Sequence, residues 1–132
     1  MKKTAMLILF MSILCLAAVE QDGAEAGVIE QLRKAAEGRD AKAQYDLGMK
    51  YENGDGVPRD QAQAVKWFRK AAEQGLAKAQ YYLGVKHLMG QGTQQSFAEA
   101  RKWWRKAAEQ GLADAQSNLG VMYDRGDGVK KD

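Results

Sequence analysis

The chain repeats itself with a fixed period of 36 residues. The segment AKAQYDLGM that begins at Ala41 returns as AKAQYYLGV at Ala77 and as ADAQSNLGV at Ala113. A period of this length predicts a solenoid, in which each unit packs on its neighbours, and argues against a globule with one central core. Solenoids mostly offer an extended surface to other proteins, so the repeat directs the search for function toward binding.

The second half of the unit also repeats. The segment RKAAEQGL occurs at Arg69 and Arg105, and LRKAAE occurs at Leu32. The identities divide the chain into a half unit at 28–40, whole units at 41–76 and 77–112, and a partial unit at 113–132. A signal peptide at 1–18 and a short linker at 19–27 are expected to precede them.

The first residues have the pattern of a secretory leader. Lys2 and Lys3 precede an uncharged apolar run at 5–19, which contains the small residues Ala17 and Ala18. This order of charge, apolar stretch and small residues is typical of a cleaved signal peptide. The run is short for a membrane span, which needs about 20 residues. We therefore expect a periplasmic or secreted protein with no membrane contact after cleavage.

Cys15 is the only cysteine, and it lies in this leader. A lipid-anchored form attached through Cys15 is the alternative localisation, although Leu14 is large where a lipoprotein signal has a small residue. After cleavage the chain would have no thiol for a disulfide, a metal site or nucleophilic attack.

The composition favours a folded protein without a strongly charged partner. The chain is 45% hydrophobic and 28% charged, which is ordinary for a folded domain. Removing two of the 20 basic residues, Lys2 and Lys3, leaves 18 against 17 acidic ones. A nearly neutral mature chain gives no electrostatic reason to expect nucleic acid or an anionic membrane as a partner.

Apolar spacing predicts two helices in each unit. Ala43, Leu47 and Tyr51 recur every four residues and predict a helix over 43–53, and a broader apolar face predicts a second helix over 62–74. A glycine inside a helix costs about 1 kcal/mol relative to alanine. The recurring glycines at 48, 84 and 120 therefore indicate close approach of a neighbouring backbone, or of the ring faces of Trp67 and Trp103.

The ends of these helices are also marked. Asp60 and Ser96 precede the second helix of each unit, with Gln63 and Glu99 three residues later, which is the spacing of a capping box. The Gly-x-Gly segments after the first helix supply the positive φ angles that end helices.

On these residues the chain resembles the Sel-1-like repeat (SLR) family, a relative of the tetratricopeptide repeat. The shared pattern is AxAxxxLGxxY, then GxGV, then AxxWFxKAAxxG, and it extends from Val28 to Asp132 with departures at His87 and Thr93. The resemblance implies an all-α, right-handed solenoid of antiparallel helix pairs whose concave side binds a peptide or protein. It also implies an adaptor of the bacterial cell envelope.

The sequence offers no set of residues suited to catalysis, a metal or a cofactor. His87 is the only histidine and stands where Tyr51 and Tyr123 stand, so we interpret it as a packing residue. Ser96 is needed as a cap, which leaves no serine with a positioned base. We expect a protein without enzymatic activity. A cell-envelope enzyme acting on peptidoglycan or β-lactams is the alternative.

Positions that vary between units are free to form a binding surface. On the first helix of each unit they face away from the conserved apolar stripe, and the middle unit is the most apolar. The candidate protein-binding residues are Lys42, Asp46, Lys50, Lys78, Tyr82, Lys86, Met89, Asn118, Met122 and Arg125. The competing interpretation is that some of these side chains pack on a neighbouring helix, with positions 49, 85 and 121 its best case because they are apolar in every unit.

The partial unit at 113–132 stops before a second helix. Leu119, Val121, Met122 and Tyr123 would then leave apolar surface uncovered. The alternatives are a homodimer through this C-terminal helix, an unidentified protein or peptide partner, and a truncated, nonfunctional paralogue.

Overall fold

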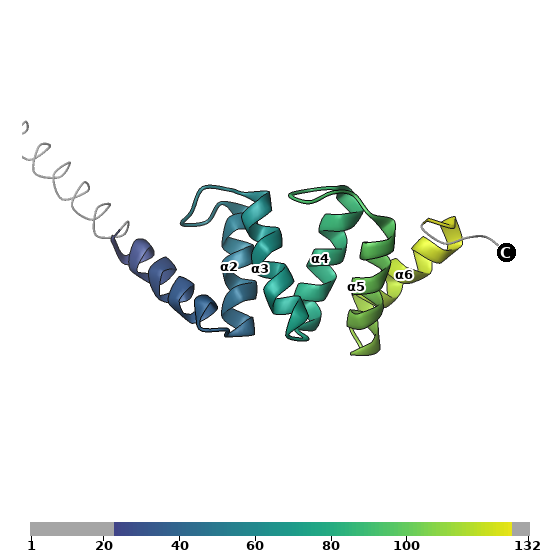
Figure 1. Cartoon of the computed structure of the whole chain (residues 1–132), viewed down its shortest axis with the longest axis horizontal. Helices are drawn as coiled ribbons and strands as arrows, with labels where there is room; N and C mark the ends of the chain where they lie inside the picture. Colours follow the sequence, from purple (N-terminus) through teal and green to yellow (C-terminus); the bar gives the residue numbers. More distant parts are fainter. Residues whose placement is uncertain (1–22, 128–132) are drawn as a thin grey trace, which may run out of the picture.

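Residues 23–127 are described by a computed structural model, and they form six helices and no strand. A first helix spans 23–37. It is followed by α2 (Ala41–Asn53), α3 (Gln61–Glu73), α4 (Ala77–Met89), α5 (Phe97–Glu109) and α6 (Ala113–Arg125). The helices stand side by side in a row that follows the sequence (Figure 1). The prediction of an all-α solenoid is confirmed.

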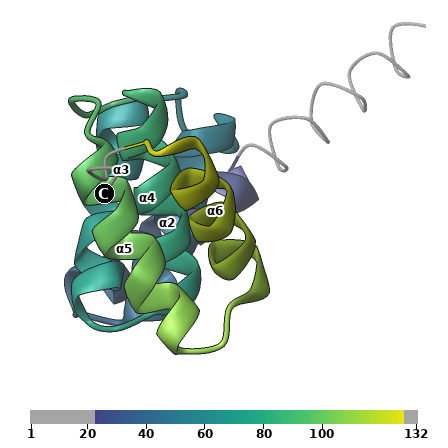
Figure 2. The same cartoon turned by 90° about the vertical axis from the view of Figure 1, so that its right-hand side faces the viewer.

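The row alternates two helix types. We call α2, α4 and α6 the A-type helices, and 23–37, α3 and α5 the B-type helices. Each A-type helix packs on the B-type helix that follows it, in the pairs α2/α3 and α4/α5, and the pairs join through α3/α4 and α5/α6. Figure 2 shows α6 lying against the end of the row.

The predicted leader and the possible lipid site at Cys15 lie outside the described residues. The first described helix begins at residue 23, inside the linker expected at 19–27. Among residues 23–127, no helix has both the length and the apolar character needed to cross a membrane.

The B-type helices begin at the predicted caps. The side-chain oxygens of Asp60 and Ser96 accept hydrogen bonds from the backbone N–H groups of Gln63 and Glu99, at 3.1 and 3.2 Å. The second half of a capping box is replaced, because the backbone N–H groups of Asp60 and Ser96 instead donate to carbonyls of the preceding A-type helix. Each cap therefore also fixes the loop between the two helices of a unit.

The A-type helices end where the glycines are. Gly54 and Gly90 are the C-caps of α2 and α4, with φ angles of 66° and 64°. Such positive φ values strain most side chains but not glycine. The Gly-x-Gly segments therefore terminate helices, as predicted.

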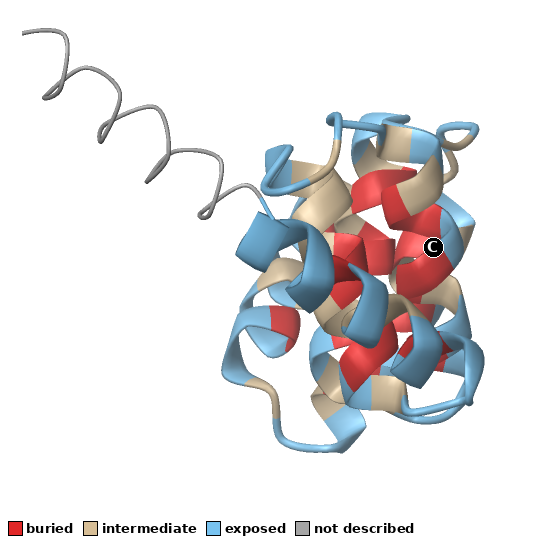
Figure 3. Cartoon of the chain, turned by 90° about the vertical axis from the view of Figure 1, so that its left-hand side faces the viewer, coloured by how far each residue is buried: buried red, intermediate tan, exposed pale blue. Residues whose placement is uncertain are grey.

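Viewed from the end of the row, the buried residues lie on the inside and exposed residues surround them (Figure 3). Leu47 and Leu83 are fully buried, and alanines of the B-type helices surround them. Small residues let the helices approach closely, and a Cβ on Gly48 or Gly84 would lie 2.7 Å from Phe68 or 2.5 Å from Trp104. The predicted close approach is confirmed at these two glycines.

The identity of the aromatic partners was predicted wrongly. Phe68 and Trp104 contact the glycines, whereas Trp67 packs with Ala36 and Leu47 toward the preceding unit. Consecutive residues of a helix point about 100° apart, so the two adjacent aromatic side chains enter different interfaces. At Gly120, a Cβ would meet no described atom within 4 Å.

Glutamine side chains connect successive units, and two of them, Gln44 and Gln80, are buried. The fourth residue of each A-type helix donates from its side-chain amide to a carbonyl near the end of the preceding B-type helix, in the pairs Gln44 to Ala36, Gln80 to Ala72 and Gln116 to Ala108. Gln74 and Gln110 then donate to the side-chain oxygens of Gln44 and Gln80, at 2.8 and 2.9 Å. We call this set the glutamine ladder. Buried polar groups need such partners, and the hydrogen bonds of the glutamine ladder fix the spacing of the units.

Candidate binding face

The ten candidate residues are not all available on the surface. Lys42, Lys78, Met89 and Arg125 are exposed, Asp46, Lys50, Tyr82 and Asn118 are partly exposed, and Lys86 and Met122 are buried. The prediction of an exposed position is therefore wrong for Lys86 and Met122, and we exclude both from the candidate face.

Lys86 is buried because its position on the A-type helix points back at the preceding unit. Its ammonium group forms an ion pair with Glu52 of α2 and donates to the side-chain oxygen of Gln61 at 2.5 Å and of Gln91 at 3.2 Å. Burying a charge requires such compensation. Lys86 therefore joins α4 to α2 and α3.

Met122 occupies the same position one unit later, and its surroundings are apolar. It is 3% exposed and packs in a cluster with Trp104 and Leu88. Leu88 stands 36 residues after Glu52, so both members of the polar pair become apolar in the next unit. Because the two exchanges occur together, the sequence carried a signal that positions 52 and 86 touch.

Tyr82 belongs partly to the core. Its ring stacks on Phe68 with centroids 5.5 Å apart and lies 5.9 Å from the ring of Tyr45. Burial, followed by the neighbouring Tyr82, raises the pKa of the Tyr45 phenol. The interpretation that Tyr82 packs on a neighbouring helix is therefore correct, whereas Met89 remains 59% exposed.

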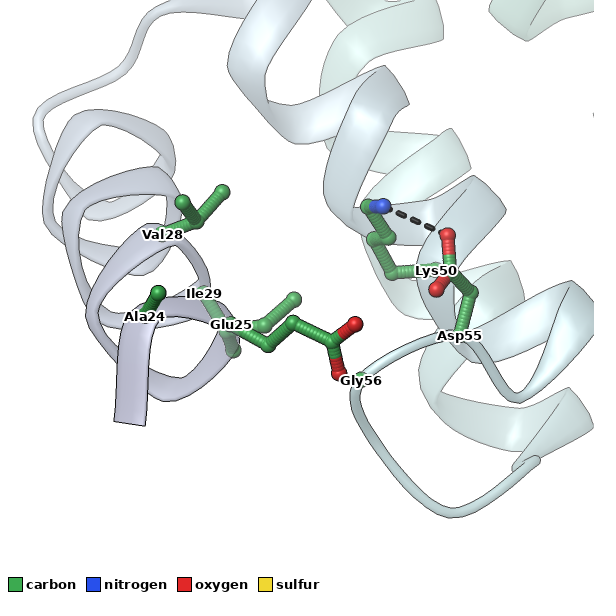
Figure 4. A pocket seen from close by; sticks show the side chains of 7 residues that line it. All are labelled: Ala24, Glu25, Val28, Ile29, Lys50, Asp55 and Gly56. Atoms are coloured by element: carbon green, nitrogen blue, oxygen red, sulfur yellow. Dashed lines mark hydrogen bonds and ion pairs between the residues drawn. The ribbon is translucent and has the colours of Figure 1, made fainter. Parts of the chain in front are cut away.

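Lys50 is engaged with its own loop. Its ammonium group lies 2.6 Å from the carboxylate of Asp55, beside an open pocket of about 210 Å³ between the first helix and α2 (Figure 4). Val28 and Ile29 supply the apolar wall of this pocket. The charge of Lys50 is thus partly neutralised.

A second pocket, of about 160 Å³, lies between α4 and α6. Its lining residues are Leu88, Trp104, Asn118, Val121, Met122, Arg125 and Asp127. Asn118 and Arg125 of the candidate face therefore lie together at one cavity. The sequence analysis did not identify this pocket. The signal in the sequence was that Asn118, which lines the pocket, stands where the preceding unit has the large side chain of Tyr82.

His87 is 5% exposed, as its interpretation as a packing residue predicts. Its Nε2 lies 3.3 Å from the guanidinium of Arg69, and its Nδ1 lies 3.4 Å from the carbonyl of Gln94. Burial is the main cause that lowers the pKa of His87. Arg69 can donate only to an unprotonated Nε2, so the contacts favour the neutral ring.

His87 and Ser96, which the sequence analysis considered as reactive residues, both make structural contacts. Within residues 23–127, no three His, Cys, Asp or Glu side chains are grouped so that they could hold a metal ion. Ser96 is used as a helix cap. Exposed large apolar side chains occur on both helix types of the described part, with Met89, Val121 and Tyr123 on A-type helices and Val28 and Phe97 on B-type helices.

The sequence pattern described as Sel1 repeat matches residues 41–76, 77–112 and 113–132. Comparison with curated protein sequences returns no match. Among solved structures, a Sel1 repeat protein from Oxalobacter formigenes is 47% identical, with a TM-score of 0.78, over 81% of this chain and 44% of that one.

Two further structures are similar. The protein c5321 of Escherichia coli, titled a protective antigen of uropathogenic strains with an SLR fold, is 50% identical, with a TM-score of 0.75, over 79% of this chain and 22% of that one. The cysteine-rich protein B of Helicobacter pylori is 30% identical, with a TM-score of 0.67, over 70% of each chain. The present chain thus spans less than half the length of the first two relatives.

The repeat match covers α2 to α6, whose caps and core are described above. The resemblance inferred from the sequence pattern is confirmed by the repeat match and by three structural neighbours of the same type. The chain belongs to the Sel1 repeat family.

Proposed function

We propose that the chain is a noncatalytic interaction module that binds a protein or peptide along its A-type helices. Sel1 repeat proteins are generally protein-interaction modules. The observation that carries the proposal here is the apolar surface left on these helices, where Met89 is 59% and Val121 50% exposed. Exposed apolar side chains next to charged ones are typical of binding surfaces, and Val121 lies four residues before the exposed Arg125 on α6.

We place this activity in the cell envelope or outside the cell. The leader pattern at residues 1–18 supports that location. The E. coli relative is described as a protective antigen, which is consistent with a protein accessible from outside. An envelope enzyme would need reactive side chains that depart from the repeat, and His87, the main departure, is occupied with packing contacts.

The partner is an unidentified protein or peptide, and a homodimer through α6 is the second arrangement. Val121 and Tyr123 on α6 are 50% and 46% exposed and could contribute to either surface. Light scattering at increasing concentration separates the two, because a homodimer doubles the mass without any added partner.

Site-specific photo-crosslinking tests the binding face. The crosslinker p-benzoylphenylalanine replaces Met89 on α4, and in a matched control it replaces Glu109, an exposed residue of the B-type helix α5. We expect the probe at 89 to capture a discrete protein from an envelope extract and the probe at 109 not to capture it. Equal capture at both positions, or capture at 109 alone, would contradict binding along the A-type helices.

A further inference from the structure

The pocket between α4 and α6 has an aromatic wall that is held in place. Trp104 of α5 donates from its indole N–H to the carbonyl of Tyr81 at 3.0 Å, and the two rings stack with centroids 6.4 Å apart. A contact surface fixed in this way loses little conformational freedom when a ligand binds. Met122 and Leu88 add further apolar surface to the pocket.

The preceding unit has a ring at the position where this unit has none. There Phe68 takes the place of Trp104, and Tyr82 of α4 stacks on it with centroids 5.5 Å apart. The residue 36 positions after Tyr82 is Asn118, which lines the pocket and carries no ring. The step between α4 and α6 therefore keeps the rings of Tyr81 and Trp104 but lacks the third ring, which Tyr82 of α4 supplies in the step between α2 and α4.

We propose that this pocket accepts an aromatic side chain of the tyrosine type from the protein segment bound along the A-type helices. The proposal rests on the proposed function and assigns a specific anchor to it. An enclosed apolar cavity of about 150 Å³ is known to hold a benzene ring, and this open pocket measures about 160 Å³. Trp104 is 2% exposed and Val121 is 50% exposed, so the incoming ring would lie mainly on Val121 and reach only the small exposed part of Trp104.

The polar residues of the pocket match a phenol group. Arg125 can donate to a phenol oxygen, and Asp127 can accept from its hydroxyl. An aliphatic side chain could form neither of these hydrogen bonds. The complementarity therefore favours tyrosine over leucine or isoleucine.

Titration with 4-methylphenol, the side-chain analogue of tyrosine, tests the pocket without a protein partner. We expect the indole N–H signal of Trp104 to shift in a ¹H–¹⁵N spectrum, and those of Trp67 and Trp103 to stay in place. The dissociation constant should be on the order of 1 mM, as is usual for so small a ligand. No shift of Trp104, or equal shifts of all three indole signals, would overturn the proposal.

The variant Asn118→Tyr copies the preceding unit and should fill the pocket with its own ring. We expect it to weaken 4-methylphenol binding at least 10-fold. The control Ser117→Tyr, which adds the same ring at an exposed residue of α6 outside the pocket, should bind as well as the unchanged protein. Val121→Trp, which enlarges a partly exposed pocket residue, serves if Asn118→Tyr does not fold. Unchanged binding in the folded blocking variant contradicts the proposal.

Crosslinking separates this proposal from the proposed function. If the probe at position 89 captures a partner and Asn118→Tyr does not reduce that capture, the aromatic anchor is refuted and the binding face stands. If 4-methylphenol binds next to Trp104 while position 89 captures nothing, the pocket is supported and the broader proposal fails. 3-Methylbutanol, the leucine-like probe, should bind at least 5-fold more weakly than 4-methylphenol, and equal affinity would contradict the preference for a phenol.

Discussion

Replacing Lys86 by methionine should destabilise the protein, although methionine is the natural residue one unit later. The side chain of Lys86 is 2% exposed and that of its partner Glu52 is 22% exposed. Removing one member of a buried ion pair costs about 3–5 kcal/mol because the other charge stays buried without compensation. Because Glu52 is partly exposed, we expect the free energy of unfolding to fall by about 3 kcal/mol, the lower end of this range.

Adding Glu52→Leu should restore stability, because the double variant reproduces the Leu88 and Met122 pair of the next step. Exchanging a whole buried pair for apolar residues is often neutral or stabilising by about 1–4 kcal/mol. The equivalent exposed position supplies the control, because Lys50 pairs with Asp55 near the surface. Lys50→Met should therefore cost about 1 kcal/mol or less.

Urea unfolding followed by circular dichroism measures these differences. With a slope of about 1–3 kcal/mol per M for a small protein, a loss of about 3 kcal/mol lowers the midpoint by roughly 1 M or more. Coupling between the two positions would be read from the double-mutant cycle. The reasoning is refuted if Lys86→Met unfolds at the original midpoint, or if the double variant is as unstable as the single one.

Three further predictions concern stability. Gly84→Ala should lower the stability by about 1–3 kcal/mol because its Cβ would overlap Trp104. Gly120→Ala, whose Cβ meets no described atom within 4 Å, should raise the stability by up to about 1 kcal/mol through helix propensity. Thermal melting compares the two variants, and equal effects would contradict the packing argument. Burial lowers the pKa of His87 below 6.5, so the folded protein favours the neutral ring. This contribution to stability is present above pH 6.5 and is lost as the pH falls. In His87→Tyr the melting temperature should therefore depend less on pH below pH 6.5, and an unchanged dependence would contradict this role of His87. Asp60→Ala removes the cap of α3 and should lower the free energy of unfolding in urea by about 1 kcal/mol. An unchanged free energy would contradict the role of this cap.

The sequence predicted the helices well because their ends carry local signals. The expected helices at 43–53 and 62–74 correspond to Ala41–Asn53 and Gln61–Glu73. The cap at Asp60 and the glycines after α2 depend on backbone geometry that a few neighbouring residues determine. Repetition every 36 residues then extended the same assignment to the later units.

The directions of individual side chains were harder to predict. An A-type helix contacts its own B-type helix and also the preceding unit, so a single apolar stripe does not describe its buried surface. This is why Lys86 and Met122 were expected at the surface. Likewise, Trp67 and Phe68 are both large and apolar, and pattern alone does not show which one faces Gly48. The pocket beside Trp104 exists because Asn118 has no ring, and a pattern of apolar and polar positions does not predict an empty space of this kind.

The glutamine ladder has a consequence for the conditions under which the protein can work. Its amide groups carry no charge and do not titrate, so the contacts that space the units should not respond to acidity or to ionic strength. These amide contacts would keep successive units at the same separation when either changes, whereas the contact between His87 and Arg69 responds to acidity.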